Sequence, residues 1–161
     1  MTRLKQISEQ VVARFGAAHR TLGTAESLTG GMIASSVAGV SGASAVLMGG
    51  VVSYDPRVKH EVLGVSQQVI DTVGLVSEPC ARQMAEGVRR TAGADYGVAT
   101  TGIAGPSGGS AEKPVGTVWI AVAGPRRTVA LLKQCGSDRG QIIDRAGAFA
   151  LGLLRDELNG K

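Results

Sequence analysis

The chain has 161 residues, of which 43% are hydrophobic and 19% charged, a composition typical of one globular domain rather than a disordered protein. Aromatic residues make up only 3% and the formal net charge is +4, so neither a base-stacking platform nor a basic DNA-binding stripe is expected. The 24 glycines follow no collagen period and instead favour glycine-shaped loops.

The sequence carries no signal for a membrane, a disulfide or a metal. Its longest nearly apolar run, residues 43–52, is far shorter than the ~20 residues of a membrane helix, so we expect a cytoplasmic protein without a membrane partner. Cys80 and Cys135 form no C-x-x-C pair, and His19 and His60 show no ligand spacing. We therefore predict no disulfide and no structural metal.

The first third of the chain predicts a helix, a strand and a second helix. Apolar residues recur at helical spacing over residues 3–18, and residues 23–27 resemble the end of a short strand. The pair Gly30-Gly31 follows as a tight turn, and small residues after it indicate a closely packed helix. A buried strand is expected over residues 44–54, because apolar and β-branched residues dominate there.

The rest of the chain alternates between helical and strand patterns. Short helices are predicted over 58–63 and 66–73, and Ser77 is an N-cap signal for a helix reaching about residue 92. The remaining predictions are a strand over 96–101, a glycine-rich loop, a hairpin of strands over 117–123 and 128–134, and a terminal helix beginning at Asp138. Helices at both ends with strands between them imply one layered α/β domain over residues 1–161.

The loop from Gly102 to Gly116 is the first candidate for function. Its five glycines allow several backbone N–H groups to approach one anion, and Lys113 adds a positive charge, a combination suited to phosphate. The sequence matches neither a dinucleotide-binding fingerprint nor a Walker A motif, so a plain surface crossover remains the alternative.

A second candidate is the segment TAESLTGG, which gathers hydroxyl groups and a carboxylate at a predicted strand-to-helix turn. Thr24, Glu26, Ser27 and Thr29 would contact a substrate there, close to helix N-terminal amides. Equally, Thr29 or Ser27 would cap the next helix while Glu26 accepts hydrogen bonds from backbone amides.

No Ser-His-Asp triad is evident, so nucleophilic catalysis requires another base. Ser44, Tyr54 and Lys59 bracket one predicted strand and its exit, and a neutral lysine can take the proton of a serine hydroxyl. A solvent-facing Lys59 and a cap-forming Ser44 are the ordinary alternative. Ser27 is the next candidate for the nucleophile.

The sequence resembles the CinA C-terminal family over residues 5–156. The resemblance rests on five blocks in the same order: TAESLTGG, GGVVSYDPRVKHEVLGV, GLVSEPCARQMAEGVR, ADYGVATTGIAGPSGGSAEKPVGTVW and GSDR. The resemblance implies a three-layer α/β/α sandwich with a mixed central sheet. It also implies deamidation of nicotinamide mononucleotide to nicotinate mononucleotide and ammonia, without a cofactor and in a homodimer. Alternatives are a non-catalytic nucleotide sensor and a competence- or DNA-damage-associated protein.

The resemblance assigns the catalytic roles to Ser44, Tyr54 and Lys59, because GASAVLMGGVVSYDPRVK aligns with the family's Ser–Tyr–Lys set. With the two candidate segments it also gives an expected set of substrate-binding residues: Thr24, Glu26, Ser27, Thr29, Gly102, Ala104, Gly105, Gly108, Gly109, Lys113 and Arg145.

Overall fold

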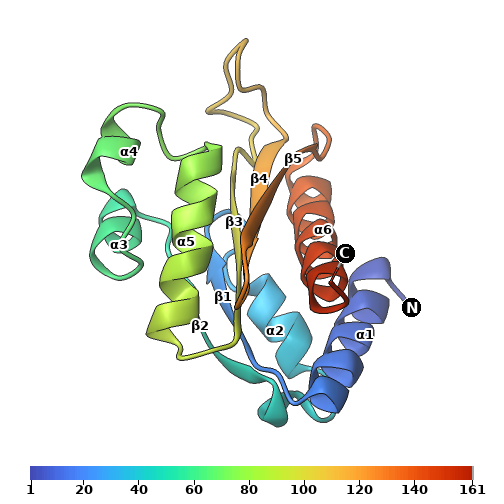
Figure 1. Cartoon of the computed structure of the whole chain (residues 1–161). Helices are drawn as coiled ribbons and strands as arrows, with labels where there is room; N and C mark the ends of the chain where they lie inside the picture. The colour runs from blue at the N-terminus through green and yellow to red at the C-terminus, as the bar shows by residue number, and fades with distance from the viewer. Residues whose placement is uncertain (161) are drawn as a thin grey trace.

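A computed structural model describes residues 1–160 as one α/β domain built on a five-stranded mixed sheet (Figure 1). The sheet order is β2-β1-β3-β4-β5, with β2, β1 and β3 parallel and both β4 and β5 antiparallel to their neighbours. The strands are β1 Leu22–Glu26, β2 Leu47–Val52, β3 Tyr96–Gly102, β4 Thr117–Ala123 and β5 Thr128–Gln134.

Helices cover both faces of the sheet, which confirms the predicted three-layer sandwich. Figure 1 shows α1, α2 and α6 on one face and α3, α4 and α5 on the other. The helices are α1 Arg3–Ala18, α2 Met32–Ala38, α3 Pro56–Glu61, α4 Gln67–Asp71, α5 Glu78–Thr91 and α6 Arg139–Leu158. In residues 1–160, no helix combines the length and the hydropathy needed to cross a membrane.

The two faces of the sheet form two separate hydrophobic cores. Phe15 and Leu154 belong to the core beneath α1, α2 and α6, whereas Met84 and Leu63 belong to the core beneath α5. Close approach of α5 to its neighbours depends on glycine: a Cβ at Gly87 would collide with the backbone of Leu63. Helix α5 is thereby locked against the segment that follows α3.

Several element boundaries follow from capping residues visible in the sequence. The Ser77 hydroxyl accepts a hydrogen bond from the Cys80 amide at the start of α5, and the Asp138 carboxylate accepts one from Gln141 at the start of α6. Asp55 caps α3 in the same way, with Pro56 at the first helical position.

The strand predicted over residues 44–54 is shorter than expected. Residues Ala43–Ala45 form a 3₁₀ turn, η1, which begins after Gly42 at a φ of 93° and closes with a hydrogen bond from the Val46 amide to the Ala43 carbonyl. Strand β2 therefore starts only at Leu47 and ends at Val52. Ser44 lies in the turn before the strand.

Candidate active site

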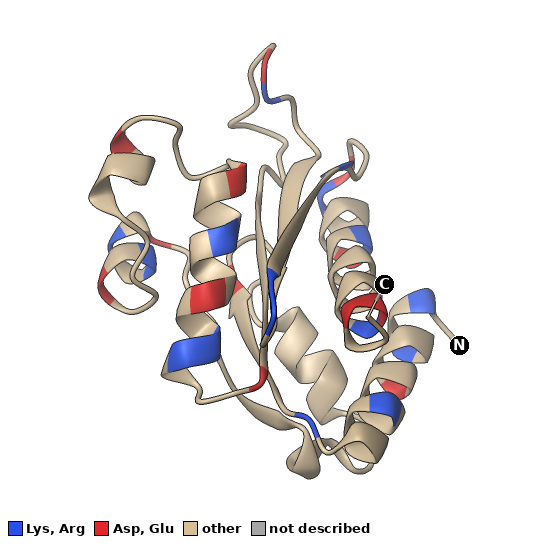
Figure 2. Cartoon of the chain, in the orientation of Figure 1, with Lys and Arg blue, Asp and Glu red and all other residues tan. Residues whose placement is uncertain are grey.

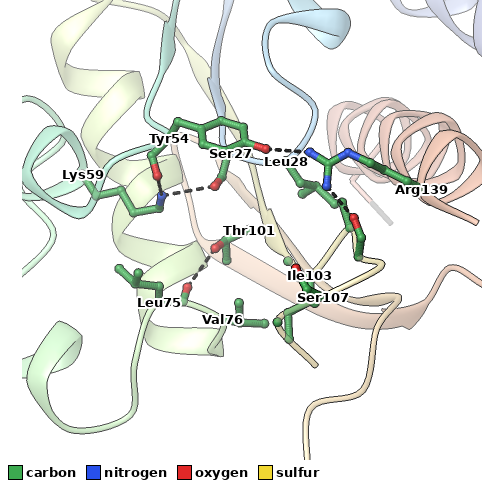
Figure 3. Close-up of a pocket in the computed structure, with 14 residues that line it drawn as sticks. Ser27, Leu28, Tyr54, Lys59, Leu75, Val76, Thr101, Ile103, Ser107 and Arg139 are labelled. Carbon is green, nitrogen blue, oxygen red and sulfur yellow. Dashed lines mark hydrogen bonds between the residues drawn. The ribbon is translucent and has the colours of Figure 1, made fainter. Parts of the chain in front are cut away.

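A cavity of about 290 Å³ lies where the parallel strands β1 and β3 end, the edge at which open α/β sheets usually bind ligands (Figure 3). Five segments that are distant in sequence meet there: the β1–α2 turn, the β2–α3 region, the residues before α5, the loop after β3 and the start of α6. The lining residues are Ser27, Leu28, Tyr54, Lys59, Leu75, Val76, Thr101, Gly102, Ile103, Ala104, Gly105, Ser107, Gly108 and Arg139.

Lys59 on α3 is the central polar residue of this cavity. Its side chain is only 1% exposed, although it carries no salt bridge in the described residues. The ammonium donates hydrogen bonds to the Ser27 hydroxyl at 3.1 Å and to the Tyr54 carbonyl (Figure 3). It also donates to the carbonyl of Ser53. Three acceptors thus surround the three N–H groups of the ammonium.

Burial lowers the pKa of Lys59, because removal from water disfavours the charged amine. Thiolate at Cys80 and carboxylate at Asp55 would oppose this shift. However, burial also raises the pKa of the Cys80 thiol to about 11, so Cys80 is neutral at neutral pH and does not balance the ammonium. The lowered pKa makes the neutral amine, which can accept a proton, more accessible at Lys59 than at an exposed lysine.

Ser27 follows β1 directly and is partly exposed to the cavity. Its amide donates to the Thr100 carbonyl and its carbonyl accepts from the Gly30 amide, so the backbone around the hydroxyl is fixed. The neighbouring Leu28 amide has no hydrogen-bond partner within residues 1–160. Leu28 follows Ser27 directly in the chain and also lines the cavity.

The loop after β3 forms the opposite wall of the cavity. Its base continues the pairing of β3 with β4 through hydrogen bonds between Ile103 and its partners Thr117 and Gly116. Arg139, the first residue of α6, donates to the Gly105 carbonyl at 2.6 Å and to the Tyr54 hydroxyl at 3.0 Å. Arg139 thus connects the loop, the β2–α3 segment and α6 (Figure 3).

The predicted Ser44–Lys59 pair is not formed. Ser44 is exposed in η1 before β2, whereas Lys59 lies beyond the other end of the same strand. A six-residue strand at about 3.3 Å per residue separates the two ends by ~20 Å. Of the predicted catalytic set, the structure brings together Lys59 and Tyr54. The hydroxyl beside Lys59, which was expected from Ser44, comes from Ser27 instead.

Tyr54 lines the cavity, but its hydroxyl does not contact Lys59. The side chain is 57% exposed and its hydroxyl accepts from Arg139, while only its backbone carbonyl accepts from Lys59. The Tyr54 phenol therefore does not orient Lys59 in this arrangement, and Tyr54 contributes to the wall of the pocket.

The other predicted residues of TAESLTGG support the fold around the cavity. Both oxygens of the buried Glu26 carboxylate accept from the first amides of α2, Ile33 and Ala34, at 2.8 and 3.0 Å. Thr29 shares a hydrogen bond with Thr100. Thr24 lies within β1, and its hydroxyl has no partner in the described residues. The capping interpretation of Glu26 is thus correct, with Glu26 rather than a hydroxyl residue binding the amides.

Within the glycine-rich loop, Gly102, Ala104, Gly105 and Gly108 line the cavity, whereas Gly109 is not among its lining residues. Lys113 and Arg145, the two cations of the expected substrate-binding set, are not among the lining residues. Lys113 donates to the Val73 carbonyl at 3.0 Å. Arg145 donates to the Cys135 carbonyl at 3.2 Å, one helical turn and a half beyond the start of α6.

Arg139 is the cation that the sequence analysis did not single out, although it lies in the GSDR block. The available signal was its place immediately after the Asp138 N-cap, where the first turn of a helix faces the sheet edge. Within the described residues, no group of three His, Cys, Asp or Glu is arranged to hold a metal ion.

Comparisons with known proteins give a consistent family. Residues 4–158 match the CinA C-terminal domain model. A CinA-like protein of Anaeromyxobacter dehalogenans (strain 2CP-C) is 51% identical over 150 residues, which are 93% of this chain and 37% of that protein. The chain spans about a third of the length of the curated relatives that it matches.

Solved structures match over nearly the whole chain. The competence/damage inducible protein CihA from Agrobacterium tumefaciens superposes with a TM-score of 0.95 at 36% identity, covering 99% of this chain and 97% of that one. A competence-damaged protein (CinA) superfamily protein from Escherichia coli gives a TM-score of 0.90 at 33% identity, with coverages of 94% and 89%.

Proposed function

This chain belongs to the CinA C-terminal domain family, and we propose that it is an amidohydrolase that converts nicotinamide mononucleotide to nicotinate mononucleotide and ammonia. The observation that carries the proposal is the buried Lys59 amine 3.1 Å from the Ser27 hydroxyl, at the wall of an open cavity. A neutral amine can remove the proton of a neighbouring serine hydroxyl and so activate the serine as a nucleophile. A module that only binds a nucleotide does not need such a pair.

The hydrogen bonds of Lys59 suit a general base. A neutral amine has two N–H groups and one lone pair, and the carbonyls of Ser53 and Tyr54 accept both N–H groups. The lone pair then faces the Ser27 hydroxyl, which donates its proton. The same atom pair that forms an ammonium-to-hydroxyl bond in the protonated state is therefore arranged for proton transfer in the neutral state.

In the proposed reaction, the Ser27 oxygen attacks the carboxamide carbon while its proton moves to the Lys59 nitrogen. The tetrahedral intermediate then expels the amide nitrogen, which takes that proton and leaves as ammonia. Water attacks the resulting ester, Lys59 removes a proton from the water, and the acid is released with Ser27 restored. The Leu28 amide is the proposed donor to the oxyanion, because it has no partner in the described residues.

The rest of the cavity supports a mononucleotide as substrate. Ala104, Gly105 and Gly108 supply loop backbone on one wall, and Arg139 adds the second cation of the lining besides Lys59. Arg139 donates two of its five N–H groups, to the Gly105 carbonyl and the Tyr54 hydroxyl. The remaining N–H groups can bind a phosphate. We assign the phosphate to Arg139 and the loop, in place of Lys113 and Arg145.

Ammonia release from nicotinamide mononucleotide, NAD and free nicotinamide, measured with the same enzyme preparation, tests this proposal. We expect turnover of the mononucleotide alone. NAD is too large for the cavity, and free nicotinamide lacks the phosphate that the cavity would bind. Binding of the mononucleotide without any ammonia would refute the amidohydrolase and favour a nucleotide sensor.

A further inference from the structure

A second polar cavity lies at the end of the sheet opposite the candidate active site. It has a volume of about 490 Å³ and lies between the last turns of α5 and the β4–β5 turn. Four arginines line it, and Figure 2 shows blue Lys or Arg positions at the end of α5 and at the β4–β5 hairpin. They are Arg89, Arg90, Arg126 and Arg127, with Glu86 as the acidic residue of the lining.

The two arginines of α5 are held by backbone carbonyls rather than by carboxylates. Arg89 donates its Nε to the Asp95 carbonyl at 2.8 Å, and Arg90 donates one Nη to the Leu63 carbonyl at 3.5 Å. Each contact uses one of the five N–H donors of a guanidinium. Both side chains thus keep a full charge and most of their donors.

The two arginines of the hairpin differ from each other. Arg127 forms a bidentate ion pair with Glu157, with distances of 3.1 and 2.9 Å, so we leave it out of the binding set. Arg126 is exposed and makes no hydrogen bond or ion pair within residues 1–160. The cavity therefore gathers three cations without a carboxylate partner, Arg89, Arg90 and Arg126, against the one carboxylate of Glu86.

We propose that this arginine-lined cavity binds a small phosphate-bearing ligand, at a site separate from the active site. Clustered guanidinium groups repel one another, and a dianion between them removes that repulsion. Phosphate oxygens match the planar donor fork of arginine, which accounts for arginine at all three positions. The cavity volume lies within the range of roughly 300–1,000 Å³ typical of small-molecule sites, which favours a metabolite over a nucleic acid.

The test is titration of the full chain with inorganic pyrophosphate, followed by backbone amide chemical shifts. The titration is made in an Arg139→Ala background, which weakens the anion site proposed for the active cavity. We expect saturable shifts at Ala94 and Gly124, which line the arginine cavity. The double change Arg90→Ala and Arg126→Ala is expected to weaken this binding at least about tenfold, as loss of charge-assisted hydrogen bonds predicts.

The matched control is Arg14→Ala, which removes another exposed arginine, from α1. It should leave pyrophosphate binding unchanged, and circular dichroism should show that all variants are folded. The proposal is overturned if shifts occur only at Gly102, Gly105 and Gly108, or if the double variant binds like the control. It is also overturned if a DNA duplex, added as a separate arm, binds through these arginines where pyrophosphate does not.

Discussion

The Lys59 amine lies 3.1 Å from the Ser27 hydroxyl, although the two residues are 32 positions apart. The parallel pairing of β1 with β2 accounts for the contact. Glu26, the last residue of β1, is in register with Val52, the last residue of β2, and the Ser53 amide donates to the Glu26 carbonyl. The chain after each strand therefore emerges at one edge of the sheet, where α3 brings Lys59 back over Ser27.

Replacement of Ser27 by alanine is expected to abolish deamidation, because it removes the proposed nucleophile. The loss in kcat should be about a thousandfold or more, with binding of nicotinamide mononucleotide nearly unchanged. Ser44→Ala is the matched control and should keep activity within about threefold, since Ser44 lies beyond the other end of β2. If the Ser44 variant were inactive and the Ser27 variant active, Ser44 rather than Ser27 would be the nucleophile.

The change Lys59→Arg is expected to be nearly as damaging as Lys59→Met. A guanidinium stays protonated in proteins and cannot take the serine proton, even though it keeps the positive charge. Both variants should be assayed for ammonia release after their folding has been checked by circular dichroism. An arginine variant with substantial activity would show that charge, rather than proton transfer, is the contribution of Lys59.

The lowered pKa of Lys59 also predicts a pH dependence of stability. Between that lowered value and the ordinary lysine value of about 10.4, the unfolded chain binds more protons at this position than the folded chain. The free energy of unfolding should therefore rise with pH across this window. Below it both states are protonated, and the burial penalty of the ammonium is fully present.

Urea unfolding of the parent and of Lys59→Met, measured from neutral pH upwards, isolates this contribution. The difference between their unfolding free energies should change in favour of the parent as pH rises, because only the parent carries the titrating amine. The kcat/KM of the parent should rise as the pH passes through the lowered pKa, where the base loses its proton, and level off above it. A difference that stays constant with pH would mean that the pKa of Lys59 is not lowered.

Much of the fold was predictable because its signals are local. The hairpin strands, the Ser77 cap and the Asp138 cap depend on residues within a few positions of each other, and the structure confirms them. The start of β2 was missed for a local reason as well. Ser44 and Ala45 have strand-compatible neighbours, but positive φ at Gly42 turns the chain into η1 first.

The candidate site was less predictable because its contacts span the whole chain. Tyr54 and Arg139 are 85 positions apart, and no spacing rule connects them. Choosing between Ser27 and Ser44 as the partner of Lys59 requires knowing at which end of β2 each serine lies. That knowledge comes from the strand order and the direction of pairing, which a pattern of apolar residues does not encode.

Arg139→Ala is expected to impair use of the nucleotide more than use of the riboside that lacks its phosphate. The change removes a cation from the cavity and releases the Gly105 carbonyl and the Tyr54 hydroxyl. Comparison of kcat/KM for the two substrates should therefore show a smaller preference for the nucleotide, mainly through KM. Lys113→Ala is the control, since Lys113 binds the Val73 carbonyl outside the cavity lining. Equal losses on both substrates would remove the phosphate role of Arg139.

Gly87→Ala is expected to destabilise the protein and to disturb the site at a distance. An added Cβ would meet the carbonyl oxygen, carbonyl carbon and Cα of Leu63, which leave no flexible side chain to move aside. Overpacking of this kind costs roughly 1–3 kcal/mol. Since Leu63 follows α3 closely, displacement of its backbone should also shift Lys59 and reduce kcat.

The matched control is Gly152→Ala in α6, where the nearest atom to an added Cβ is the end of the Arg155 side chain at 4.0 Å. This change should stabilise the protein by about 0.5–1 kcal/mol, because alanine loses less backbone entropy than glycine in a helix. Urea unfolding of both variants measures the contrast. If Gly87→Ala unfolded at the same urea concentration as the parent, α5 would be free to move away from Leu63, and the packing that holds α3 over Ser27 would need another source.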